Sequence, residues 1–354
     1  MKMRSVVNLA ISFLFIFINS ELFAQDDVIH WIADYDQAVA QATGTNKNIF
    51  AVFTSEHCHP CQLLKKHILT KPEIVQYVNE RMIPLAIDID VNPTLATTYR
   101  VQGVPATIII RATKEEVDRF VGGDDSNEFA DDYLDAIISF NEQGKTINEL
   151  EETLRLDPNN PNIMLEIMKK YFSQALEQKA FEYKNMIENG YQDFFSQHKA
   201  EIYYEIAEFY DNDWDRRELA IPYLNEILQI QDADRSKAYY MLADIYFTTE
   251  KVNEGFDVLE KGLVIYPNDL IMNVVYLNEC VDTKLRIDQG IGYGLAAVQS
   301  EGNNGVKAYL YYLIARLYEI KTNKPEAVRM IDKAIELDPE KEQYKQYKKI
   351  LLES

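Results

Sequence analysis

The chain up to residue 145 alternates short apolar runs with segments whose apolar residues recur every three or four positions. Unbroken apolar runs predict buried strands, whereas the longer recurrence predicts one buried face of a helix. Strands are predicted over 48–54, 82–89, 106–111 and 117–121, and helices over 35–43, 62–69, 72–80, 94–99 and 127–141. Gly44 should end the first helix. This order predicts a central sheet with helices on both faces.

From residue 146 onward the apolar pattern is helical throughout and repeats. Pairs of large residues recur with a spacing of 36, at Tyr203-Tyr204, Tyr239-Tyr240, Val275-Tyr276 and Tyr311-Tyr312. Repeats of this length are typical of stacked helix pairs, each of which buries its apolar face on its neighbour. We expect these tyrosines to serve mainly as core packing, with some lining a groove that takes extended peptide.

The repeat resembles the tetratricopeptide repeat (TPR). One unit places on that motif Tyr239, Leu242, Ala243, Tyr246, Gly255, Leu259, Gly262 and Pro267, and the last unit places Tyr311, Ile314, Ala315, Tyr318, Ala327, Ile331, Ala334 and Pro339. The unit at 272–300 is degenerate, 154–190 is an atypical opening pair, and 347–352 is a capping helix. The resemblance implies an all-α solenoid over residues 146–354, with a protein partner on its concave face.

The first 24 residues have the layout of a secretory signal peptide. Lys2 and Arg4 precede an apolar stretch at Val6–Ile18, and Ala24 offers a small residue for cleavage. The stretch is short for a bilayer span, although an uncleaved anchor is the alternative. We therefore expect an exported protein, periplasmic or secreted, with no stable membrane span after cleavage.

Charge narrows the range of partners. The chain carries a formal net charge of −21. An acidic surface repels phosphate backbones, so we expect no nucleic-acid partner.

Two of the three cysteines form a C-x-x-C pair, Cys58 and Cys61. The pair follows directly on a predicted strand, where a helix begins. The first thiol therefore meets free backbone N–H groups and the positive end of the helix dipole, which favour the reactive thiolate. Cys280 stands alone in an apolar helical stretch, and we interpret it as a buried packing residue. The pattern predicts dithiol–disulfide chemistry.

The pair, taken with Gly103-Val104-Pro105 before the strand at 106–111, makes residues 25–145 resemble a thioredoxin-fold domain. The strand Ile49–Phe53, the Asp88-Ile89-Asp90 run and Val121-Gly122 fit the same pattern. The resemblance implies an α/β thioredoxin fold with a central mixed sheet. It also implies that Cys58 is the nucleophile and Cys61 the resolving thiol. Pro105 would be a cis-proline facing the pair, and the Val104 backbone would pair with an extended substrate. An ordinary trans proline is the alternative.

His59 and Pro60, between the cysteines, are the residues that we expect to tune the thiolate. An imidazole next to Cys58 stabilises a thiolate, while Pro60 suits a first helical turn. Stabilising the reduced form raises the potential, so we expect a value between about −270 mV and about −120 mV, the values of thioredoxin and DsbA. The alternative is that His59 is only an exposed loop residue. Val52 stands where the family often has a buried acid, and His57 where many thioredoxins have Trp.

A zinc site is the main competitor for the cysteine pair. Structural zinc needs four converging ligands, usually two spaced pairs. The sequence has no second C-x-x-C, and His57 and His59 flank Cys58 in a way that points them in different directions. We therefore expect neither a metal nor a cofactor.

The sequence leads to two functional hypotheses. The first is an exported thiol–disulfide oxidoreductase, active on protein thiols and disulfides and serving cell redox homeostasis, whose repeat domain recruits proteins. The alternative is a TPR-based adaptor whose thioredoxin-like domain is a docking module with little catalysis.

Overall fold

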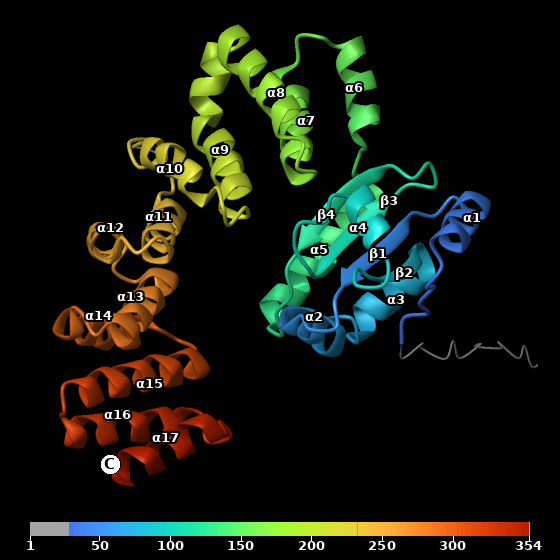
Figure 1. The fold of residues 1–354 in the computed structure, drawn as a ribbon. Helices are drawn as coiled ribbons and strands as arrows, with labels where there is room; N and C mark the ends of the chain where they lie inside the picture. The colour runs from blue at the N-terminus through green and yellow to red at the C-terminus, as the bar shows by residue number, and fades with distance from the viewer. Residues whose placement is uncertain (1–27, 232, 354) are drawn as a thin grey trace, which may run out of the picture. The chain divides into compact units, whose positions relative to one another are not determined.

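The computed structural model describes residues 28–231 and 233–353, and the chain forms two compact units, Met1–Gly144 and Lys145–Ser354 (Figure 1). The predicted signal peptide at 1–24 lies outside the described residues. Among the described residues, no helix combines the length and the apolar character that a membrane crossing requires.

A four-stranded mixed sheet forms the centre of the first unit (Figure 1). Its strands are β1 (Ile49–Thr54), β2 (Ile83–Asp88), β3 (Ala106–Ile110) and β4 (Glu116–Val121), in the order β2-β1-β3-β4. Strand β1 is parallel to β2 and antiparallel to β3, which is antiparallel to β4. The predicted mixed sheet is confirmed.

Helices cover both faces of this sheet. They are α1 (Tyr35–Thr45), α2 (His59–Leu63) with a π-helical turn at Leu64–Ile68, α3 (Pro72–Arg81), α4 (Pro93–Thr98) and α5 (Asn127–Glu142). Phe50 and Val52 of β1 pack in the core that contains residues of α3 and α5, while Ala51 and Phe53 pack in the core that contains Ala38 of α1. Strand β1 is therefore buried on both faces, which explains its unbroken apolar sequence.

The predicted end of the first helix at Gly44 was wrong. Helix α1 continues to Thr45 and ends at Asn46, whose φ of 54° lies in the left-handed region. Asparagine tolerates this conformation better than most residues, so it supplies the helix end that we had assigned to glycine.

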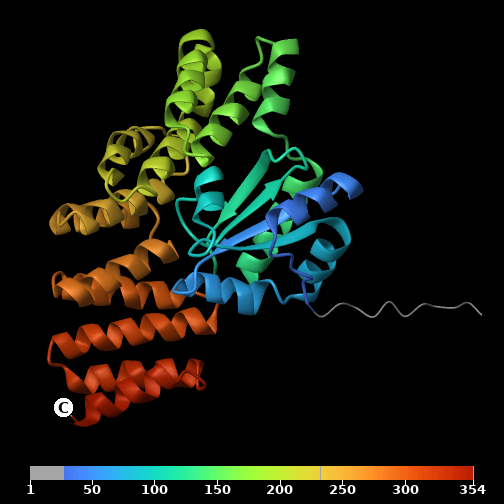
Figure 2. The ribbon, with the colours of Figure 1, turned by 45° about the vertical axis from the view of Figure 1, so that its right-hand side comes forward.

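The second unit consists of helices stacked in antiparallel pairs (Figures 1 and 2). They are α6 (Ile147–Leu156), α7 (Pro161–Ser173), α8 (Glu177–Gly190), α9 (Gln192–Asp211), the 3-10 turn η2 (Arg217–Ala220), α10 (Ile221–Ile227), α11 (Ser236–Thr248), α12 (Val252–Ile265), α13 (Leu270–Thr283), α14 (Ile287–Ser300), α15 (Asn304–Ile320), α16 (Lys324–Leu337) and α17 (Glu342–Glu353). The predicted helical solenoid is confirmed.

Packing inside the helix pairs accounts for the small and aromatic residues of the repeat. A Cβ atom at Gly262 would lie 2.6 Å from the Met272 sulfur and 2.9 Å from the Tyr239 ring, so only glycine allows this approach. Tyr276 and Tyr312 are also buried in this core. Cys280 is fully buried there, as its interpretation as a packing residue required.

A ladder of ion pairs joins successive helix pairs. Four cations spaced by 35 residues, Arg216, Lys251, Arg286 and Lys321, lie at the turn inside a helix pair, and each pairs with an acid of the preceding pair. The acids are Glu177, Glu218, Asp257 and Asp288, respectively. Arg286 also binds Glu260 at 2.6 Å. The ladder ties each pair to its neighbour.

Candidate active site

The cysteine pair lies where β1 ends and α2 begins. Cys58 is the N-cap of α2, with an extended backbone, and its sulfur accepts a hydrogen bond from the Cys61 backbone N–H at 3.1 Å. In the preceding turn, the Ser55 hydroxyl donates to the Asp90 carboxylate at 2.6 Å. Pro60 occupies the first helical turn, where its missing N–H leaves no gap in the hydrogen bonding.

The two cysteines form a disulfide with very different access to solvent. Their sulfur atoms are 2.12 Å apart and their Cα atoms 5.2 Å apart. Cys61 is fully buried, whereas Cys58 is partly exposed. A reagent from solution can therefore reach the first sulfur but not the second.

The loop that carries Val104 and Pro105 faces this disulfide. The Val104–Pro105 peptide bond is cis. The Val104 carbonyl oxygen lies 3.3 Å from the Cys58 sulfur, a contact in which a reduced thiol could donate its proton. Val104 is half-buried and Pro105 is buried. The structure thus places both residues of the predicted substrate-binding segment next to Cys58.

Gly122 and Gly123, which follow β4, support both sides of the site. The Gly122 N–H donates to the Pro105 carbonyl oxygen at 2.9 Å. A Cβ atom at Gly123 would lie 2.4 Å from the Pro60 carbonyl oxygen and 2.9 Å from Pro105 Cγ. Sequence reasoning treated this pair only as a turn. Its position directly after the last strand was the available signal.

Arg119 of β4 holds the loop that leads to Val104. Its guanidinium pairs with Glu116 and donates to the backbone carbonyls of Tyr99 at 2.7 Å and Arg100 at 3.3 Å. These bonds fix the segment between α4 and β3. Nothing in the sequence pattern marked Arg119 for this role.

Polar groups near the pair are mostly at the surface. His57 and His59 are exposed, and so is Glu56, the acid that precedes them. Asp124 follows Gly123, and the Asp125 backbone N–H that it accepts keeps the pKa of its carboxyl below the ordinary value. Val52 is 3% exposed and lies in the core beside Leu64, so the place of the family's buried acid is apolar.

Metal-ligating side chains are not gathered anywhere in residues 28–231 and 233–353. No three His, Cys, Asp or Glu residues of this part of the chain come close enough together to hold an ion.

Comparison with known families matches both units. A thioredoxin-like domain matches residues 35–138, and the tetratricopeptide repeat matches residues 236–269 and 308–341. The chain therefore contains a thioredoxin-like domain followed by TPR repeats. The two repeats matched are the units that fit the motif best in the sequence. Among curated proteins, none matches the chain.

Solved structures similar to parts of the chain include both kinds of protein. The "DsbH Oxidoreductase" is 19% identical, with 39% of this chain and 96% of that chain covered and a TM-score of 0.30. A putative disulphide-isomerase from Bacteroides thetaiotaomicron is 25% identical, covering 34% and 98%, with a TM-score of 0.29. The TPR protein YrrB, described as having an unusual peptide-binding site, is 15% identical, covering 58% and 100%, with a TM-score of 0.43.

Proposed function

We propose that the protein is an exported thiol–disulfide oxidoreductase whose repeat domain recruits protein partners. The observation that carries this proposal is the asymmetry of the pair. The sulfur of Cys58 is accessible and accepts a backbone hydrogen bond, and the sulfur of Cys61 is buried directly behind it. This is the arrangement that a nucleophilic thiol and a resolving thiol require.

The chemistry is a pair of thiol–disulfide exchanges. The Cys58 thiolate attacks one sulfur of a client disulfide, which breaks and releases one client thiolate. The Cys61 thiolate then attacks the Cys58 sulfur, closes the internal disulfide and releases the second client thiolate. Two electrons move from the pair to the client, and an external dithiol must reduce the pair again. The same steps run in reverse when the client is a dithiol.

Three groups of the chain serve these steps. The Cys61 N–H donates to the Cys58 sulfur, a bond that favours negative charge on it once the disulfide is reduced. His59, exposed and next in sequence, can add positive charge close to the same atom. The backbone of Val104 lies beside the sulfur and can pair with an extended client segment.

Export is supported by the sequence of residues 1–24, with its basic start, apolar middle and small residue at Ala24. An oxidising compartment lets disulfides persist, which agrees with a protein whose function is to exchange them. The repeat domain supplies a protein-binding solenoid, and its partner is proposed to occupy the concave face.

The test is a pair of cysteine variants. Cys58→Ser should abolish insulin-disulfide reduction and dithiol oxidation, because the accessible nucleophile is gone. Cys61→Ser should keep the first attack and accumulate mixed disulfides that a thiol reductant releases. Wild type and Cys58→Ser with equal rates would refute the enzymatic function.

The adaptor function is favoured by one observation, the buried Val52 at the place of the family's acid. That acid is associated with proton transfer to the resolving thiol, so its absence fits a docking module. An adaptor captures its partner equally well with Cys58→Ser and gives no rate above that of a free thiol.

A further inference from the structure

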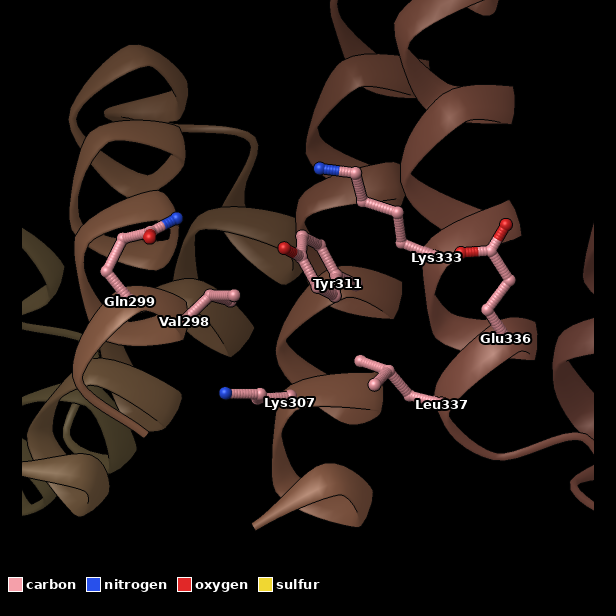
Figure 3. Close-up of a pocket in the computed structure, with 7 residues that line it drawn as sticks. All are labelled: Val298, Gln299, Lys307, Tyr311, Lys333, Glu336 and Leu337. Carbon is pink, nitrogen blue, oxygen red and sulfur yellow. The ribbon is translucent and has the colours of Figure 1, made fainter. Parts of the chain in front are cut away.

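A pocket of about 340 Å³ lies in the last full helix pair of the solenoid (Figure 3). Its lining comes from the end of α14, from α15 and from the end of α16, and consists of Val298, Gln299, Lys307, Tyr311, Lys333, Glu336 and Leu337. The volume falls at the lower end of the range of small-molecule sites, and suits a ligand about the size of one amino acid.

Two lysines give this pocket positive charge in a chain whose net charge is −21. Lys307 and Lys333 are both half-buried. Within the described residues, neither ammonium forms an ion pair with a carboxylate, whereas the neighbouring Lys321 and Lys348 pair with Asp288 and Asp332. Half-buried ammonium groups without a counter-charge favour an anion.

The directions of the side chains fit one ligand group. Lys307 and Lys333 both extend toward α14 in Figure 3, and the Tyr311 hydroxyl points into the same space. The Lys333 ammonium lies 5.0 Å from the centre of the Tyr311 ring, which holds it over the pocket. The Glu336 carboxylate points away from both ammonium groups in Figure 3, so it leaves their charge uncompensated.

The remaining lining is apolar. Val298 is 4% exposed, Leu337 is half-buried, and the Tyr311 ring presents its face to the same space. An inorganic anion would leave this surface uncovered, whereas a branched alkyl group would bury it at about 25 cal/mol per Å².

We propose that this pocket binds a small organic carboxylate that carries a short branched apolar group. Its carboxylate accepts hydrogen bonds from Lys307 and Lys333, and the apolar group packs on Val298 and Leu337. The ligand is a free acid or the last residue of a peptide, since both present the same chemistry. The proposal does not depend on the cysteine pair, so either one can fail without the other.

The experiment is a ligand-observed NMR titration of the full chain with 4-methylpentanoate. The acid should bind saturably, and Lys307→Gln or Lys333→Gln should weaken it about tenfold, because each variant removes a charge-assisted hydrogen bond. The control Lys341→Gln removes the same charge from an exposed site outside the pocket and should leave binding unchanged. Circular dichroism checks that each variant is folded.

Two further probes make the result decisive. The neutral 4-methylpentanamide and inorganic phosphate should each bind at least about tenfold more weakly. A tetrapeptide ending in leucine distinguishes the two sources, because tighter binding than the free acid assigns a peptide terminus and weaker binding assigns a free acid. Absence of saturable binding by both acid and peptide, equal binding of the amide, or no effect of either lysine variant would overturn the proposal.

Discussion

Gly123→Ala should disturb the site without touching a cysteine. The added Cβ would lie 2.4 Å from the Pro60 carbonyl oxygen, whereas an ordinary carbon–oxygen contact is about 3.3 Å. Close to 1 Å of movement is therefore needed, and the atom in the way is backbone, which cannot rotate aside. The second contact, 2.9 Å from Pro105 Cγ, closes the opposite direction. We expect a loss of about 1–3 kcal/mol in the free energy of unfolding, the usual cost of overpacking.

The same substitution should slow the exchange reaction. Moving the first turn of α2 away from Pro105 changes the distance between the Cys58 sulfur and the Val104 carbonyl, and misplacement on this scale reduces rates by about tenfold or more. Urea unfolding and the rate of insulin-disulfide reduction measure the two effects.

The matched control for this experiment is Gly103→Ala, in the loop beside Val104. A Cβ there meets no atom within 4 Å. Its stability should change by no more than about 0.5–1 kcal/mol. If the Gly123 and Gly103 variants have the same stability and rate, the close approach at Gly123 does not position the site.

Three further predictions concern the repeat domain. Burial raises the pKa of the Cys280 thiol to about 12, so iodoacetamide near neutral pH should label Cys280 only after denaturation, and labelling of folded protein would contradict its burial. Burial also raises the pKa values of Glu205 and Glu279 above the ordinary 4.5, so the folded state holds more protons than the unfolded state between these values. Stability should therefore rise as pH falls from 7 toward 5, and a lower urea midpoint at pH 5 would refute this. Arg286→Met should cost about 1–3 kcal/mol because it leaves two acids without their cation, whereas Arg329→Met, which breaks an exposed pair within one helix, should cost less than about 1 kcal/mol. Equal urea midpoints for these two variants would show that the ladder adds no stability.

The elements of the fold were predictable where a local pattern decides them. Strand β1 is buried on both faces, and its unbroken apolar run says so directly. The repeat was visible because each helix pair must present the same small and large residues to its neighbour. Helix ends were less certain, as the end at Asn46 rather than Gly44 shows. There the choice depended on which of two nearby residues takes the left-handed conformation.

The candidate site was predictable only in its chemistry-bearing residues. Cys58 and Cys61 are close in sequence, and Gly103-Val104-Pro105 is a recognisable run before a strand. Gly123 and Arg119 act through contacts with residues far away in the chain, so no local pattern announces them. The same is true of the pocket beside Lys307, which needs three helices to form.

The ion-pair ladder has a consequence for how the solenoid responds to damage. Since each rung connects a turn of one helix pair to the pair before it, a lesion in one repeat is felt by the next. Such an array tends to melt as one block instead of fraying from an end. A protein that works outside the cytoplasm would thereby expose fewer loose ends to proteases.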